Sequence, residues 1–244
     1  MNLQEIMNKE IEAIFYLTKQ CNFKCTYCYK KDQKNIKYLS NSKVKLILDS
    51  FLSFNPSSFY LRVRGGEFTM NLDSLSLLEQ MFSFLAKLAK KEKSLVFEFS
   101  TNMYGLKNNY FYELKKLIDK YKLNKIAKIN IDLSIHAEYF PYNNKGKYKL
   151  LILNILQMKT IFNEVANLRI VLDNFDLEKY PMIPKIIKNE TQMKLKTSNT
   201  YGLFLDPGRE NYLKFLIDEN NYIIYFKDNK ELKIPLVKFI KGNK

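Results

Sequence analysis

Hydrophobic and polar residues follow two alternating patterns along most of this chain. Short apolar runs typical of strands are each followed by a longer stretch in which apolar residues recur at helical spacing. The expected strands are Glu12–Thr18, Phe59–Arg64, Leu95–Ser100, Ile129–Ile135 and Leu168–Asp173. The expected helices are Ser42–Phe54, Leu72–Lys91, Tyr110–Lys122 and Lys147–Phe162. No repeat of fixed length accompanies this alternation, which argues against a repeat architecture.

The alternation of strands and helices predicts an α/β fold. Strands joined through helices run parallel, with right-handed crossovers. A weaker sixth unit follows the five clear ones: the helical stretch Leu177–Lys188, which Pro181 and Pro184 interrupt, and a strand at Leu203–Asp206. We therefore predict a partial (β/α)6 barrel of mainly parallel strands.

The pattern changes near the C-terminus. Tyr222–Phe226 and Leu232–Phe239 are strand-like runs separated by the polar segment Lys227-Asp228-Asn229-Lys230, which predicts a β-hairpin. We expect residues 1–208 to form the partial-barrel domain and residues 209–244 to form a C-terminal extension with a helix and this short hairpin.

The strands of the predicted barrel have one apolar and one polar face. In Ile129–His136 the odd positions are aliphatic and the even positions are polar, and Leu95–Asn102 and Tyr60–Arg64 show the same split. A parallel strand covered on both faces is continuously apolar instead. We therefore expect helices on the apolar face and, on the polar face, an open barrel interior that holds a polar ligand. An antiparallel sheet with one solvated face is the alternative.

Composition narrows the class of protein. The chain has 244 residues, of which 46% are hydrophobic and 27% charged, as is typical of a globular protein with a buried core. Its formal net charge is +15, but only four of its 40 basic residues are arginines, the residues that recognise bases bidentately. We therefore interpret the lysines as a solvated surface and expect no nucleic-acid partner.

The expected location of the protein depends on two features that the sequence lacks, a membrane-spanning segment and a signal peptide. No apolar run approaches the ~18 residues of a membrane span. The first ten residues carry Glu5, Lys9 and Glu10 where a signal peptide would be apolar. We expect a cytoplasmic protein without a membrane span, and in that reducing compartment cysteines are more often metal ligands or reactive thiols than disulfides.

All three cysteines, Cys21, Cys25 and Cys28, lie in one eight-residue window after the first expected strand. Thiolates so close in sequence can converge on one metal centre. A structural zinc site needs four protein ligands, and the only histidine, His136, lies on another strand. A [4Fe–4S] cluster ordinarily takes four thiolates, so three would leave one iron open to a non-protein ligand. The spacing alone leaves both kinds of centre open.

The cysteine motif C-x-x-x-C-x-x-C, with Tyr27 before the last cysteine, resembles the signature of the radical S-adenosylmethionine (SAM) superfamily. The resemblance extends over roughly residues 14 to 206. Three further segments match the family in order along the chain: Gly65-Gly66-Glu67 after the second strand, Thr101-Asn102 after the third, and Asp132–His136 at the end of the fourth.

The resemblance implies two cofactors, a [4Fe–4S] cluster held by the three cysteines and SAM bound at its open iron. It implies that Gly65-Gly66-Glu67 holds the SAM amino group, because two glycines let the backbone come close to a ligand. Tyr27 would pack on the adenine. Short polar groups for the ribose hydroxyls and the methionine carboxylate are offered by Ser100, Asn102, Asp132 and Ser134.

Three features depart from the family pattern. No cysteine follows Cys28, so we expect one cluster and not the cysteine-rich auxiliary domain of many peptide-modifying relatives. Phe68-Thr69 stand where relatives usually have Pro and Leu. The glycine-rich segment often found on the fifth strand has no counterpart in Leu168–Asp173.

Four charged or titratable residues are candidates for contact with the substrate. His136 and Glu138 follow the fourth strand and would lie at the barrel mouth, where either can act as an acid or base. The alternative for His136 is a hydrogen bond to the strand end. Arg62 and Arg64 lie on the polar face, where they can hold an anionic group of the substrate or pair with carboxylates in the barrel.

The resemblance also implies the activity. The cluster, reduced by an external flavodoxin- or ferredoxin-like donor of one electron, would cleave SAM to a 5′-deoxyadenosyl radical that abstracts hydrogen from a substrate. The loop CNFKCTYCYK most resembles members that act on peptides or proteins. The enzymatic alternatives are a small metabolite, such as a sugar or nucleotide derivative, and activation of a glycyl-radical enzyme. A zinc or nucleic-acid-binding module without catalysis is the non-enzymatic alternative.

Overall fold

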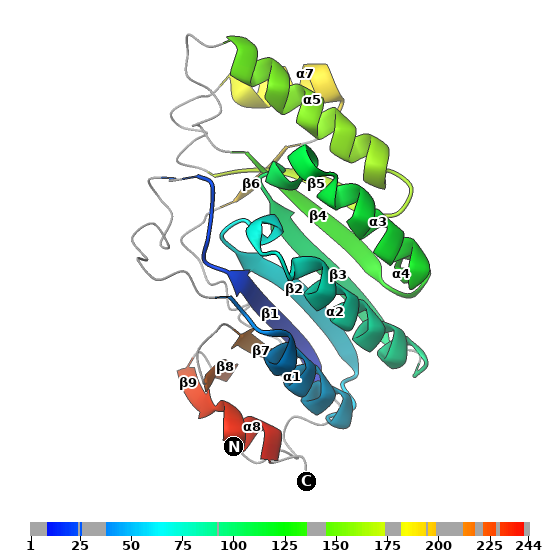
Figure 1. The fold of residues 1–244 in the computed structure, drawn as a ribbon, viewed down its shortest axis with the longest axis vertical. Coiled ribbons are helices and arrows are strands. Elements are labelled where there is room, and N and C mark those ends of the chain that lie inside the picture. The colour runs from blue at the N-terminus through cyan, green and yellow to red at the C-terminus, as the bar shows by residue number, and fades with distance from the viewer. Residues whose placement is uncertain are drawn as a thin grey trace.

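The computed structural model describes residues 9–23, 25, 38–91, 93–135, 145–173, 182–193, 195–198, 212–217, 222–227 and 230–241. Its centre is a nine-stranded sheet in the order β6-β5-β4-β3-β2-β1-β7-β8-β9 (Figure 1). The strands are β1 (Glu10–Thr18), β2 (Ser58–Gly65), β3 (Ser94–Thr101), β4 (Lys128–Ile135), β5 (Asn167–Asp173), β6 (Leu195–Ser198), β7 (Tyr212–Ile217), β8 (Tyr222–Lys227) and β9 (Lys230–Pro235).

Neighbouring strands from β6 through β1 to β7 are parallel, and the pairs β7–β8 and β8–β9 are antiparallel. In the part of the chain that is described, β6 and β9 are the two edges, so the sheet does not close. This open, mainly parallel α/β sheet confirms the predicted partial barrel.

Helices connect the successive strands from β1 to β6 and lie along one face of the sheet (Figure 1). The α-helices are α1 (Asn41–Ser53), α2 (Ser74–Ala89), α3 (Tyr110–Lys120), α4 (Leu123–Ile126), α5 (Lys145–Phe162), α7 (Ile183–Thr191) and α8 (Leu236–Lys241), and the 3-10 helices are η2 (Phe68–Met70) and η3 (Tyr104–Asn108). None of the helices in the described ranges is long and apolar enough to cross a membrane.

Phenylalanines dominate the core between the helices and the sheet. Among the described residues, the largest fully buried side chains are all phenylalanines. Phe51 on α1 packs edge-to-face against Phe59 on β2 and Phe215 on β7, which joins helix and sheet. Ser40 caps α1 by accepting a hydrogen bond from the Lys43 amide at 3.3 Å.

The predicted split between apolar and polar strand faces is confirmed. On β4, Ile131, Leu133 and Ile135 are buried in the helix-covered core. The alternate residue Asp132 bonds instead to Arg169 on the opposite face. Because successive strand residues point to opposite faces, this register sends the polar positions of β4 to the face that the helices leave uncovered.

The sixth strand does not lie where the sequence pattern places it. Strand β6 is Leu195–Ser198, whereas Leu203–Asp206 lies outside the described residues. Its four residues Leu-Lys-Thr-Ser contain a single apolar residue, so no alternation marks it. The preceding helix α7 begins at Ile183, with Pro184 in its first turn, where a proline is tolerated.

The C-terminal hairpin is confirmed as β8 and β9, but its second strand is shorter than predicted. It ends at Pro235, and Leu236–Lys241 forms α8, which buries Phe239 against Phe51 and Phe54. Strand β7, which the sequence pattern did not reveal, pairs in parallel with β1. The extension therefore continues the main sheet, and a domain boundary at residue 208 stays a prediction.

Candidate functional site

Three of the four segments that match the family motifs lie at the carboxyl ends of β1, β2 and β3. The cysteine loop leaves β1, Gly65-Gly66-Glu67 ends β2, and Thr101-Asn102 ends β3. Parallel neighbours in the order β3-β2-β1 bring these ends to one edge of the sheet. Ligands of open α/β sheets bind at this edge.

The two glycines bring the end of β2 against the cysteine loop. The Gly66 amide donates to the Thr18 carbonyl at 2.9 Å, and the Glu67 amide donates to the Gln20 carbonyl at 2.8 Å. Gly65 has a φ of 140°, and a Cβ there would overlap the Thr18 carbonyl. A Cβ on Gly66 would overlap the Gln20 carbonyl. We expected the glycines to admit a ligand, but the close approach among the described residues is to the backbone that leads into Cys21.

The Glu67 carboxylate is hydrogen-bonded to other residues of the protein. Its Oε1 accepts hydrogen bonds from the hydroxyls of Thr69 at 2.8 Å and Thr101 at 2.9 Å, and its Oε2 accepts one from the Asn102 amide at 2.7 Å. Burial raises the pKa of Glu67, and these hydrogen bonds oppose that rise. The side chain thus ties the end of β2 to the end of β3.

The cysteine loop is also held at its base. The Leu39 amide donates to the Leu17 carbonyl at 3.2 Å, and the Tyr38 hydroxyl donates to the Gln20 side chain. The Asn71 side-chain amide donates to the same Leu17 carbonyl at 3.2 Å. The segments on either side of the cysteine loop, residues 17–20 and 38–39, are therefore hydrogen-bonded neighbours.

Two of the three cysteines lie in the described residues: Cys21 is exposed and Cys25 is buried. The side-chain amide of Asn102 lies 3.8 Å from Cys21 Sγ and donates to Asn22 Oδ1 at 2.8 Å. Asn102, predicted to contact SAM, is thus directly beside the first thiol.

Several predicted site residues lie outside the described part of the chain: Tyr27, Cys28, His136 and Glu138. Within the described part, no group of three His, Cys, Asp or Glu side chains forms a metal site. The two described cysteines fit a thiolate-bound metal centre in donor type, because both lie on the loop at the carboxyl end of β1. Their roles and those of the four other residues stay predictions.

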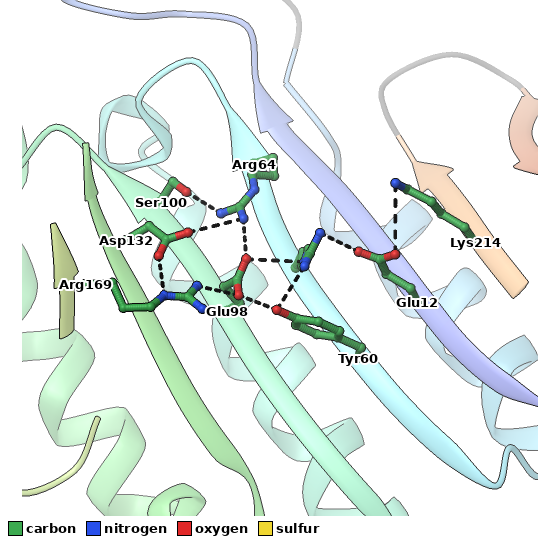
Figure 2. A network of polar contacts seen from close by, with 9 residues as sticks. Glu12, Tyr60, Arg64, Glu98, Ser100, Asp132, Arg169 and Lys214 are labelled. Atoms are coloured by element: carbon green, nitrogen blue, oxygen red, sulfur yellow. Dashed lines mark hydrogen bonds and ion pairs between the residues drawn. The ribbon is translucent and has the colours of Figure 1, made fainter. Parts of the chain in front are cut away.

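A network of charged side chains occupies the polar face of the sheet (Figure 2). Glu98 on β3 lies at its centre. Its Oε1 accepts from Arg64 and lies 3.3 Å from Arg62 Nε, while its Oε2 accepts from the Tyr60 hydroxyl and, at 2.6 Å, from Arg169. Burial alone would raise the pKa of Glu98, but Arg64, Arg62, the Tyr60 hydrogen bond and Arg169 together outweigh it and lower the pKa to about 2. The carboxylate is therefore ionised at neutral pH.

The network continues toward β4 and β5. Arg169 Nε donates to Asp132 Oδ1 at 2.6 Å, and Arg64 Nη2 lies 3.5 Å from Asp132 Oδ2. Arg64 Nη1 donates to the Ser100 hydroxyl. Ser100 and Asp132, both predicted to contact SAM, are thus engaged by arginines.

Toward β1 and β7, the network ends at Glu12 and Lys214, whose side chains are buried. Arg62 Nη1 lies 2.6 Å from Glu12 Oε1, and Lys214 Nζ lies 4.0 Å from Glu12 Oε2. Burial raises the pKa of Glu12 and lowers that of Lys214. Of the two roles considered for Arg62 and Arg64, pairing with carboxylates is the one seen here.

Sequence reasoning missed five members of this network: Glu12, Tyr60, Glu98, Arg169 and Lys214. Two signals were present. Three of the four arginines of the chain lie on expected strands. Strand alternation also put Glu98 on the polar face. Neither signal shows which charges meet across strands, because that depends on strand order and register.

Comparison with known proteins shows the fold. The sequence matches no protein-family model and no curated protein. Native anSMEcpe with bound AdoMet aligns with a TM-score of 0.58 and 16% identity, over 83% of this chain and 55% of that chain. The same protein with bound AdoMet and the Cp18Cys peptide aligns with a TM-score of 0.56, again at 16% identity, with the same coverage.

This chain therefore spans about half the length of the chain in these two solved structures. Identities of this size show likeness of fold alone. The chain has the partial-barrel α/β fold of a protein solved with AdoMet, and this is the fold that the resemblance to the radical SAM superfamily implies.

Proposed function

We propose that this chain is a radical SAM enzyme. The observation that carries the proposal is the attachment of the cysteine loop: the Gly65-Gly66-Glu67 backbone bonds to Thr18 and Gln20, directly before Cys21, in a fold shared with an AdoMet-bound protein. The same cysteine spacing on an unrelated fold would have no such support.

Cys21, Cys25 and Cys28 would hold a [4Fe–4S] cluster, which when bound supplies the electron that cleaves SAM. The backbone of Gly65-Gly66-Glu67 would orient the SAM amino group, with Asn102 and Ser134 bonding its polar atoms. Asn102 suits this role because its side chain already lies beside Cys21. Ser100 and Asp132 lie two residues before Asn102 and Ser134 on their strands and would act through the arginines that bond them.

Tyr27 would cover the adenine and so exclude water from it. His136 and Glu138 would lie where the substrate enters, and either would give or take a proton there. A flavodoxin- or ferredoxin-like protein would supply the electron. All of these assignments follow from the motif resemblance and the strand positions.

The proposed substrate is a peptide or protein. Two observations support this choice: the resemblance of the cysteine loop to peptide-modifying members, and a structural match solved with a bound peptide. A small metabolite and a glycyl-radical enzyme remain alternatives under the same chemistry.

Metal and sulfide analysis of anaerobically purified chain tests the proposal against a zinc module. We expect about four irons and about four sulfides per chain. Cys25→Ala is the matched control and should hold neither in stable form, because only two protein thiolates remain. One tightly bound zinc without sulfide in the wild type would contradict the proposal.

A further inference from the structure

The charged network has more cations than anions. Arg62, Arg64, Arg169 and Lys214 supply four positive charges, and Glu12, Glu98 and Asp132 supply three negative ones. Glu12 lies nearer to Arg62, at 2.6 Å, than to Lys214, at 4.0 Å, so three guanidinium groups face three carboxylates and Lys214 is the additional basic group. Glu98, with its pKa of about 2, supplies its full charge at neutral pH. Among the described residues, the network therefore has no excess of carboxylates that would repel an anionic ligand.

The positive groups are also the accessible ones. The side chains of Arg64 and Arg169 are 25% and 22% exposed, whereas that of Glu98 is 2% exposed. In its contacts with described residues, Arg169 uses Nε and Nη2, so the two N–H groups on Nη1 remain for another acceptor. Arg64 Nη1 bonds only a neutral hydroxyl, that of Ser100, among the described residues. A ligand on this face would meet guanidinium groups before carboxylates.

Arg169 and the groups that Arg64 contacts on β3 and β4 lie deeper in the sheet than the expected SAM site. Ser100, Asp132 and Arg169 are register partners on β3, β4 and β5. They lie two residues before Asn102 and Ser134 on their strands, which corresponds to about 7 Å along the sheet. A group bound there would lie deeper in the half-barrel than SAM bound at the strand ends.

We propose that Arg64 and Arg169 bind a carboxylate of the substrate, so that the substrate of this enzyme is acidic. This inference rests on the proposed function for the identity of the site. A carboxylate matches the planar donor fork of arginine, and the N–H groups on Arg169 Nη1 can donate to it. The substrate would then extend from its anchored carboxylate toward SAM at the strand ends.

Glutarate is a suitable probe, with the uncharged glutaramide as the matched ligand control. At constant ionic strength, glutarate should raise the melting temperature of the wild type, and glutaramide should not. Arg169→Gln should bind glutarate about tenfold more weakly or worse. Lys116→Gln, at an exposed surface ion pair with Glu113, should respond as the wild type does. Equal responses of all three proteins would overturn the proposal.

A second variant serves if Arg169→Gln does not fold. Ser100→Asp places a carboxylate beside Arg64 Nη1, so it should raise the melting temperature without ligand and abolish the response to glutarate. A variant that keeps the full response would overturn the proposal.

Repeating the titration with the cluster-reconstituted protein in saturating SAM distinguishes two ligands of the arginines, a carboxylate of the substrate and the carboxylate of SAM itself. We expect glutarate to bind with SAM present, because the two sites lie at different depths. Loss of glutarate binding on addition of SAM would assign the arginines to the SAM carboxylate and overturn the proposal. Failure of SAM itself to bind would count against the proposed function, while the titration without SAM would still test the anion site.

Discussion

Replacing Gly66 by alanine should remove most of the iron from the purified protein while leaving the sheet folded. A Cβ at this position would overlap the Gln20 carbonyl, which accepts the Glu67 amide and directly precedes Cys21. That carbonyl belongs to backbone and can move only with the cysteine loop, so the substitution should displace the first thiolate. Iron and sulfide per chain measure the loss, and circular dichroism reports the fold.

Gly105→Ala is the matched control for this substitution. Its Cβ would meet side-chain atoms of Thr69 and Phe111 at 2.9 and 3.1 Å, and side chains can adjust by a few tenths of an ångström. We expect Gly105→Ala to keep its iron even if its melting temperature falls. Full iron content in Gly66→Ala would show that the glycine does not position the cysteine loop.

The second large effect is expected for Glu98→Gln, which leaves three guanidinium groups around an uncharged amide. Removing one partner of a buried ionic group typically costs about 3–5 kcal/mol, so the free energy of unfolding at pH 7 should fall by about that amount. The folded-state pKa of about 2 lies below the ordinary value of 4.5. The stabilisation is therefore complete above about pH 5 and is lost as the pH falls through 4.5 toward 2.

Urea unfolding of wild type and variant at pH 7, 4 and 3 measures this difference, which should shrink as the pH falls. Glu113→Gln is the control, since Glu113 forms an exposed pair with Lys116 on α3 and should change stability by about 0.5 kcal/mol or less. A difference between wild type and Glu98→Gln that does not change with pH would show that Glu98 does not stabilise the fold through its charge.

Alternation of residue types was sufficient to predict the first five strands and the main helix between each pair, but not the short helix α4. The split on β4 between Ile131, Leu133 and Ile135 and their polar neighbours predicted which face the helices cover. Strand β6 was misplaced because Leu195–Ser198 is too short and too polar to show a period. Strand β7 was missed, and its pairing with β1 is a long-range contact that no local pattern encodes.

The sequence predicted which residues belong to the candidate site better than it predicted which contacts they make. Gly65, Gly66 and Asn102 were recognised from their motifs, and the structure brings them to the cysteine loop. The role of the Glu67 carboxylate was not predictable, because its acceptor sites are used by Thr69 and Thr101, whose positions depend on how β2 and β3 end. The same holds for Glu98, whose three arginines come from two other strands.

Release of 5′-deoxyadenosine is the most direct test of the central claim that this chain cleaves SAM reductively at a cysteine-held cluster. The anaerobically reconstituted and reduced chain, given SAM without substrate, should release 5′-deoxyadenosine slowly, because cleavage needs only the reduced cluster and the bound sulfonium. Cys25→Ala, treated identically, sets the background. Product above that background in the wild type is the predicted result, and wild-type protein that holds its full cluster yet yields none above it would contradict the claim.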